Sequence, residues 1–106
     1  MVPDFTMDKR TPTYDVEAFK AAVSEGRADF TRTAIQGARA LGFGLADMKS
    51  AIALMTRRQF YKSMTSLADH RVWQDVYHVH YEGQWIYVKF TAGVICEFTL
   101  LSFKQK

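Results

Sequence analysis

The sequence predicts one α+β domain, with helices from the N-terminal half packed on one face of an antiparallel β-sheet. In the first half, apolar residues recur at the three- and four-residue spacing of helices. In the second half, runs rich in aromatic and β-branched residues are separated by turn residues, as in strands. Because the helices precede the strands instead of alternating with them, we expect a sheet with one covered face and one open face. A length of 106 residues fits a single domain.

Three helices are expected from capping residues and apolar stripes. Asp15 and Thr31 are N-cap candidates for the first two, and Gly26 and Gly42 are placed to end them. Asp47 lies in the first turn of the third, where a carboxylate is favourable. The stripes are Val16, Phe19 and Val23; Ala34, Ile35, Ala38 and Leu41; and Leu45, Met48, Ile52 and Met55. This periodicity predicts that these side chains face the core.

Four strands are expected in the second half of the chain. They cover residues 60–66, 72–81, 84–91 and, roughly, 94–103. Glu82-Gly83 has the length and composition of a tight hairpin turn between the second and third strands. The start of the last strand is less determined, because Ala92-Gly93 and the residues after it can turn in more than one way.

The two-residue turn decides which side chains of the hairpin share a face. It pairs Tyr81 with Gln84, His80 with Trp85, His78 with Tyr87, and Val76 with Lys89. The expected core face carries Trp73, Tyr77, Val79, Ile86, Val88 and Phe90, and the open face carries Gln74, His78, His80, Trp85, Tyr87 and Lys89. Cations and aromatic rings together are typical of surfaces that hold phosphates and stack bases. An ordinary solvated sheet face is the alternative.

Charge and composition exclude several protein classes. The net charge of +3 comes entirely from residues 57–106, which weakly favours a polyanionic partner. Cys96 is the single cysteine, so an internal disulfide is excluded and a reducing compartment is favoured. No apolar run approaches the roughly 20 residues of a membrane span, and the N-terminus lacks the pattern of a signal peptide. We therefore expect a cytoplasmic protein without a membrane association.

The His78-x-His80 pair raises the question of a metal site, because residues two apart on a strand share a face. A zinc site needs at least a third ligand, and Cys96 is isolated in the sequence. Motifs for binding nucleotide phosphates or for hydrolysis, such as a Walker A loop, are also absent. We expect neither a metal nor a cofactor in this chain.

Several uninterrupted strings resemble the MqsR family, the toxin half of bacterial type II toxin–antitoxin pairs. They are DKRTPT (8–13), FYKSMTS (60–66), ADHRVWQDVY (68–77), YVKF (87–90) and LSFKQK (101–106). The resemblance covers residues 7–106, which would form a single RelE-like toxin domain. Residues 1–6 would be an N-terminal extension.

The resemblance implies a RelE-like microbial ribonuclease fold and an activity. The family consists of mRNA interferases, metal-independent endoribonucleases that cleave single-stranded mRNA at GC-containing triplets and thereby inhibit translation and growth. It also implies a cognate antitoxin with a zinc-binding domain and a helix-turn-helix domain, so that zinc and DNA belong to the partner. The alternative is a non-catalytic RNA- or antitoxin-binding regulator on the same scaffold.

The resemblance also implies the residues of the active site. Its motifs carry the catalytic set onto Lys62, Gln74, Tyr87 and Lys104. The hairpin pairing independently puts Gln74 and Tyr87 on the open face. Alternation along the strand puts Lys62 and Tyr61 on opposite faces, so Lys62 can lie on the open face. Lys104 can lie there too if Phe103 faces the core. The further residues expected to contact RNA are Tyr61, His78 and Lys89, where His78 replaces the arginine usual in the family.

Cleavage of RNA without a metal uses the 2′-hydroxyl as the nucleophile on the adjacent phosphate. We expect Lys62 and Lys104 to stabilise the charge on the phosphoryl oxygens, and Tyr87 to donate a proton or contact the phosphate. Gln74 would orient the phosphate or ribose. Clustered cations can lower the pKa of a lysine and can stabilise a tyrosinate, and the sequence leaves open whether they do so here. The general base stays open, with His78 as a candidate because its ordinary pKa is near neutrality, and a protonated His78 would instead contact phosphate.

Overall fold

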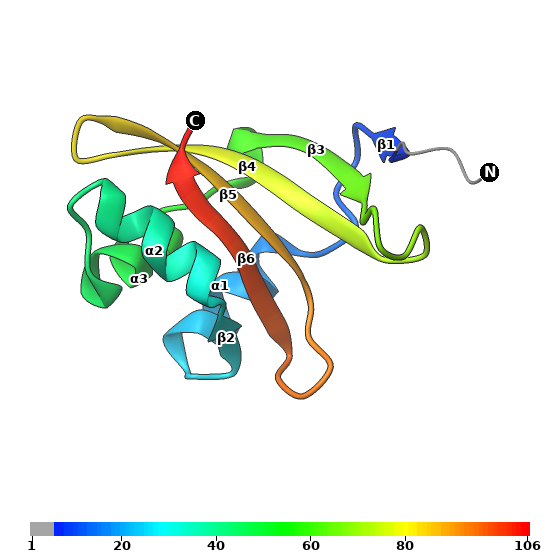
Figure 1. The fold of residues 1–106 in the computed structure, drawn as a ribbon, viewed down its shortest axis with the longest axis horizontal. Helices are drawn as coiled ribbons and strands as arrows, with labels where there is room; N and C mark the ends of the chain where they lie inside the picture. Colours follow the sequence, from blue (N-terminus) through cyan, green and yellow to red (C-terminus); the bar gives the residue numbers. More distant parts are fainter. Residues whose placement is uncertain (1–5) are drawn as a thin grey trace.

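Three α-helices pack on a six-stranded sheet in the computed structural model, which describes residues 6–106 (Figure 1). The helical elements are α1 (Val16–Ser24), α2 (Arg32–Ala40), α3 (Leu45–Ala53) and the 3-10 turn η1 (Arg57–Gln59). The strands are β1 (Asp8–Lys9), β2 (Ala28–Phe30), β3 (Phe60–Thr65), β4 (Trp73–Tyr81), β5 (Gln84–Ala92) and β6 (Phe98–Gln105). The sheet order is β1-β3-β4-β5-β6-β2, antiparallel except between β2 and β6. The predicted α+β class is confirmed. Residues 1–5 of the expected extension lie outside the described part of the chain.

The helices begin and end where their capping residues predict. The side chain of Asp15 accepts a hydrogen bond from the Glu17 amide, and that of Thr31 accepts one from the Ala34 amide. Gly26 and Gly42 follow α1 and α2 with positive φ angles of 76° and 86°. One residue of the expected third stripe differs: Leu45, at the first position of α3, is 53% exposed.

The predicted register of the hairpin between β4 and β5 is confirmed. Tyr81 pairs with Gln84 and His78 with Tyr87, and Val76 pairs with Lys89. Glu82 and Gly83 have φ angles of 51° and 76°, as both central residues of a type I′ turn require. The expected core face is buried against the helices, apart from Trp73, which is half-buried with the Lys9 ammonium 4.3 Å from its ring centre.

Two strands and one boundary differ from the sequence-based expectation. The sequence does not predict the short edge strands β1 and β2, and β6 begins at Phe98 instead of near residue 94. Residues 93–97 form a loop closed by a hydrogen bond from the Gly93 amide to the Glu97 carbonyl, and Val94 and Ile95 in it are almost fully exposed. These β-branched residues look like a strand in sequence, but no neighbouring strand pairs with them in the described residues.

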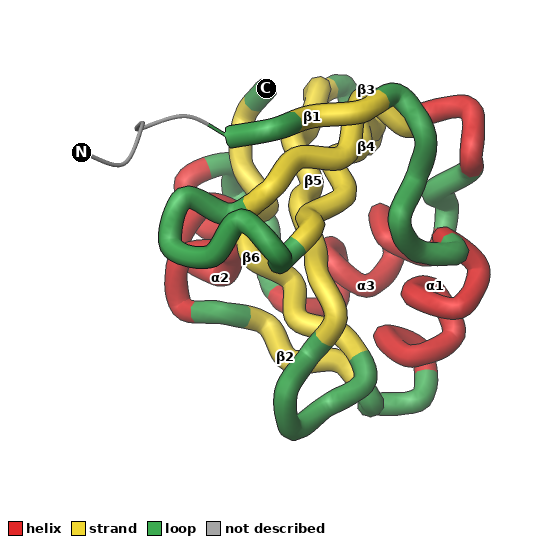
Figure 2. The backbone as a smooth tube through the Cα atoms, turned by 90° about the vertical axis from the view of Figure 1, so that its right-hand side faces the viewer, coloured by secondary structure: helices red, strands yellow, loops and turns green. Residues whose placement is uncertain are grey.

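The helices leave the second face of the sheet free. All three helices contribute to the same core cluster as the inward side chains of β4 and β5, and α1 and α3 lie side by side (Figure 2). Helix α2 runs so close to β6 that a Cβ at Gly37 would collide with the Phe103 carbonyl oxygen. Beneath the sheet, the buried Asp75 carboxylate accepts hydrogen bonds from the Thr13 and Tyr14 amides, which ties the segment before α1 to β4.

Candidate active site

Three side chains from three adjacent strands form the centre of the open face. His78 on β4 pairs directly with Tyr87 on β5, and Tyr87 pairs directly with Lys104 on β6. Directly paired residues project from the same face. The Lys104 Nζ lies 5.2 Å from the centre of the Tyr87 ring, and the centroids of the His78 and Tyr87 rings are 6.1 Å apart. Phe103 is fully buried, so Lys104 faces out as expected.

A β-bulge brings Tyr61 into this central group. Phe60 pairs with Tyr77 and Lys62 pairs with Val76, so Tyr61 is the extra residue on β3. The Tyr61 ring stacks on the His78 imidazole with centroids 4.3 Å apart, and the Lys62 Nζ lies 5.5 Å from the centre of the Tyr61 ring. The expected alternation, which sets Lys62 against Tyr61, is therefore wrong, because the bulge puts both side chains on the open face.

The next row of the open face crosses four strands and supplies two more lysines. Lys62, Val76, Lys89 and Ser102 pair in sequence across β3, β4, β5 and β6. The Lys62 Nζ lies 3.4 Å from a carboxylate oxygen of Asp8, which β1 brings to the edge of the sheet. Sequence reasoning missed Asp8, and a two-residue strand leaves no periodicity by which to find it.

Gln74 lies on the open face but apart from the central group. It pairs with Met64, and it precedes His78 by four residues on β4. At about 3.3 Å per residue this is a separation of roughly 13 Å along the strand. The row that contains Lys62 and Lys89 lies between Gln74 and Tyr87. The structure thus brings Tyr87, Lys104 and Lys62 into adjacent rows and leaves Gln74 one row further away.

Burial changes the acid–base properties of the central residues. Burial, and to a lesser extent Tyr61, raises the pKa of Tyr87 above its ordinary value of 10.0. Burial and then the Lys106 charge lower the pKa of His78, so its imidazole is neutral at neutral pH. Of the two effects that clustered cations can have, stabilisation of a tyrosinate does not occur at Tyr87, because burial disfavours the phenolate. Among the lysines of this face, the pKa of Lys89 is lowered, by burial and then by Lys104.

Among the described residues, the His-x-His pair is not joined by further metal ligands. Within residues 6–106, no group of three His, Cys, Asp or Glu side chains could hold a metal ion. The His80 ring lies edge-on to Trp85, with centroids 5.0 Å apart, and Asp75 is turned to the opposite side of β4. In the same part of the chain, no helix is long and apolar enough to cross a membrane.

Two comparisons with known proteins identify the family of this chain. Residues 11–105 match the family described as motility quorum-sensing regulator, toxin of MqsA. The chain is also similar to the mRNA interferase toxin MqsR of Escherichia coli (strain K12), with 38% identity over 100 residues. That alignment covers 94% of this chain and 100% of the relative. A match of this extent means that the chain belongs to the MqsR toxin family.

Proposed function

We propose that the open face of the sheet cleaves single-stranded mRNA without a metal ion, and that the chain is thereby the toxin of a type II toxin–antitoxin pair. Membership of the MqsR family supports the toxin and mRNA interferase activity. The observation that carries the proposal for the site is the direct cross-strand alignment of His78, Tyr87 and Lys104. It aligns a neutral imidazole, a protonated phenol and a cation on one exposed surface.

The proposed reaction is a transesterification within the RNA. The 2′-oxygen forms a bond to phosphorus while the bond from phosphorus to the 5′-oxygen breaks, which leaves a 2′,3′-cyclic phosphate and a 5′-hydroxyl. His78 accepts the proton of the 2′-hydroxyl, because its lowered pKa keeps the imidazole neutral. Tyr87 gives its proton to the departing 5′-oxygen, because its raised pKa keeps the phenol protonated. Each residue thus starts in the protonation state that its step requires.

Charge on the phosphoryl oxygens is stabilised by lysines on both sides of this pair. Lys104 lies beside Tyr87, and Lys62 lies beside Tyr61 in the adjacent row. Ammonium groups placed beside the reacting phosphate stabilise the negative charge that develops on its oxygens in the transition state. Lys89, half-buried between them, adds to the positive potential, and Tyr61 supplies a stacking surface next to His78. Gln74, one row further along, would bind an adjoining phosphate or ribose instead of the reacting one.

The partner and the sequence preference follow from the family and are proposals for this chain. The matched family is described as the toxin of MqsA, which supports a cognate antitoxin as the partner. We propose that this antitoxin is of the zinc-binding, helix-turn-helix type and that the toxin meets DNA only through it. Cleavage at GC-containing triplets, in the cytoplasm where mRNA is translated, completes the proposed function.

The test is RNA cleavage by single variants in the presence of a chelator. Tyr87→Phe, Lys62→Ala, Lys104→Ala and His78→Ala should each lower kcat at least a hundredfold, and Gln74→Ala should mainly raise KM. Lys49→Ala, an exposed lysine on the helical side, is the matched control and should cleave normally. Full activity in Tyr87→Phe and Lys104→Ala would contradict the assignment of the site. RNA binding without any cleavage by the unmodified chain would support the non-catalytic regulator instead.

A further inference from the structure

Beyond the central group, the open face contains a pocket. Of the site residues expected from the sequence, Tyr61 and His78 line it. The pocket has a volume of about 300 Å³. Its lining comes from η1, the start of β3, the middle of β4, the start of β5 and the C-terminal segment, and includes Arg58, Tyr61, His78, Trp85 and Lys106. Trp85 belongs to the row beyond His78, so the pocket and Gln74 lie at opposite ends of the face.

The aromatic lining of this pocket is exposed to solvent. Trp85 is 55% exposed and Tyr61 is 44% exposed, although both are large apolar side chains. The Tyr61 ring already stacks on His78, so the wall of the pocket is continuous with the group that surrounds Tyr87. Aromatic side chains in such a position are the surfaces on which single-stranded nucleic acids stack their bases.

The rim of the pocket is cationic. The Lys106 Nζ lies 5.6 Å from the centre of the Trp85 ring, and the Lys106 amide donates a hydrogen bond to the Trp85 carbonyl, which holds this residue beside the ring. Arg58 borders the pocket from the side of η1. Within residues 6–106 neither Arg58 nor Lys106 forms an ion pair with a carboxylate. Their charges are therefore available to an anionic ligand.

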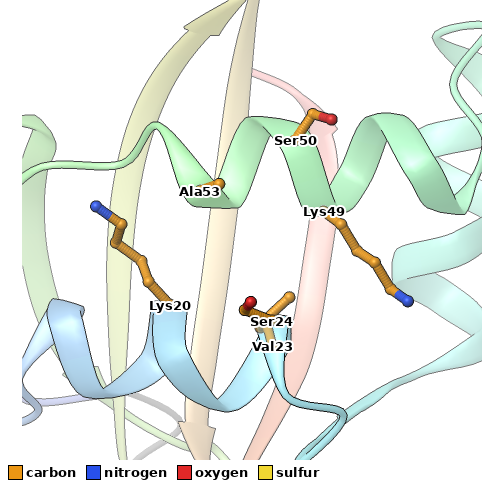
Figure 3. A pocket seen from close by; sticks show the side chains of 6 residues that line it. All are labelled: Lys20, Val23, Ser24, Lys49, Ser50 and Ala53. Carbon is orange, nitrogen blue, oxygen red and sulfur yellow. The ribbon is translucent and has the colours of Figure 1, made fainter.

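A second hollow, on the helical side of the molecule, does not combine cations with aromatic rings in this way. It lies between α1 and α3 and has a volume of about 270 Å³, with Lys20 and Lys49 at its border (Figure 3). The two ammonium groups point away from one another (Figure 3), and Lys20 is paired with Glu17 at 3.2 Å. The two lysines thus do not converge on a common anion position in this hollow, and no aromatic side chain of the described residues lines it, in contrast to the pocket at Trp85.

We propose that the pocket at Trp85 is a nucleotide subsite, which stacks the base of a residue flanking the cleaved phosphate on Trp85 and holds its phosphate with Lys106 and Arg58. The proposal rests on the proposed function, because it places the RNA backbone along the open face from Gln74 over Tyr87 to Trp85. The ligand is an unpaired nucleotide of the same RNA, recognised by its π-face and its charge. Stacking of this kind discriminates weakly between bases, so the subsite contributes affinity more than sequence preference.

Fluorescence of Trp85 gives a direct readout of binding without cleavage. The chain has two tryptophans, so Trp73→Phe, on the opposite face, leaves Trp85 as the single reporter. A single-stranded RNA with 2′-O-methyl groups cannot undergo attack by the 2′-oxygen and should quench this fluorescence in a saturable titration. Trp85→Ala should weaken binding of the same RNA about tenfold, and Trp85→Phe should retain most of the affinity. Because this readout needs no cleavage, it separates the subsite from the catalytic proposal.

An abasic scan identifies which nucleotide occupies the subsite. In RNAs that carry one abasic residue at each position in turn, the penalty of Trp85→Ala should disappear at a single position next to the cleavage point. In cleavage assays, Trp85→Ala should raise KM about tenfold and change kcat less than threefold. An unchanged KM, or an equal penalty at every abasic position, would overturn the subsite even if Tyr87→Phe abolishes cleavage. Quenching by the antitoxin but not by RNA would assign the pocket to the protein partner and overturn the proposal as well.

Discussion

The Asp8 carboxylate lies 3.4 Å from the Lys62 ammonium, and this contact joins the shortest strand of the sheet to the candidate active site. Asp8 on β1 pairs with Met64 on β3, two residues after Lys62 on the same strand, so Asp8 and Lys62 lie on the same face of the sheet. The contact restrains the lysine, but it also adds a negative charge beside the place proposed for an RNA phosphate. An ion pair that is partly exposed contributes about 1 kcal/mol or less. We therefore expect the Asp8 carboxylate to matter more for the electrostatic potential that an RNA phosphate meets than for the stability of the fold.

We predict that Asp8→Asn strengthens RNA binding. Loss of the carboxylate leaves the Lys62 charge uncompensated, so KM for a short RNA should fall about two- to fivefold at low salt, the range that about 0.5–1 kcal/mol allows. The difference from the unmodified chain should shrink as ionic strength rises. Asp69→Asn, which changes a carboxylate in the exposed turn before β4, is the control and should leave KM unchanged. A raised KM in Asp8→Asn would mean that the carboxylate mainly positions Lys62.

The pH dependence of cleavage should report His78. Burial and the nearby Lys106 lower the pKa of His78 below its ordinary value of 6.5. If the neutral imidazole is the base, kcat/KM falls as pH drops through that lowered pKa, so the acid limb should have its midpoint below pH 6.5. Lys106→Ala removes one cause of the shift and should move the midpoint upward, whereas Lys49→Ala should not. A limb that stays in place in His78→Ala would exclude this histidine as the base.

The open face could be predicted from the sequence because one short turn determines it. Once Glu82-Gly83 is taken as a two-residue turn, alternation assigns every side chain of the hairpin, and the structure has the same pairs. The bulge at Tyr61 could not be predicted in this way. It depends on how β3 pairs with a distant strand, and one extra residue leaves no change in the apolar pattern.

The two edge strands of the sheet could not be predicted from the sequence, for a related reason. Strands β1 and β2 contain two and three residues, too few for any periodicity to develop. Their strand conformation comes from pairing with β3 and β6 and not from local propensity. Asp8 reaches the candidate site only through such long-range pairing, so motifs and alternation could not predict it. Alternation does predict that Trp85 lies on the open face, but the pocket beside it also needs Arg58 and Lys106, which other elements bring to it.

Asp75 should matter for stability and not for catalysis. Its carboxylate is fully buried and accepts hydrogen bonds from the Thr13 and Tyr14 amides at 2.9–3.1 Å, on the side of β4 opposite the open face. Asp75→Ala leaves these amides without their acceptor, so the free energy of unfolding in urea should fall by about 3 kcal/mol. Asp69→Ala, which removes a carboxylate bonded only to Arg71 in an exposed turn, should cost about 1 kcal/mol or less. The folded fraction of Asp75→Ala should retain its kcat, and a proportional loss of kcat would show that the segment at Thr13 shapes the site.

Stability at alkaline pH should depend on Tyr77. Burial, and then the charge of Asp75, raises the pKa of Tyr77 to about 12, and the buried hydroxyl lacks a hydrogen-bond partner in the described residues. The ordinary value in the unfolded chain is about 10. Since the folded pKa is the higher one, this stabilisation is complete below pH 10 and is lost as pH rises towards 12. The loss amounts to about 3 kcal/mol, because each pKa unit corresponds to about 1.4 kcal/mol.

Tyr77→Phe should remove this dependence and keep the packing of the ring. At pH 7 the variant should be as stable as the unmodified chain or more stable by about 1 kcal/mol, since no hydrogen bond is lost and a buried polar group is removed. Urea unfolding between pH 9 and pH 11 should then show a shallower decline for Tyr77→Phe than for the unmodified chain. Tyr61→Phe, which removes a hydroxyl from an exposed ring, should decline like the unmodified chain. A destabilised Tyr77→Phe at pH 7 would mean that the hydroxyl is hydrogen-bonded in solution, for example by a buried water, and equal slopes in all three proteins would mean that Tyr77 titrates like an exposed tyrosine.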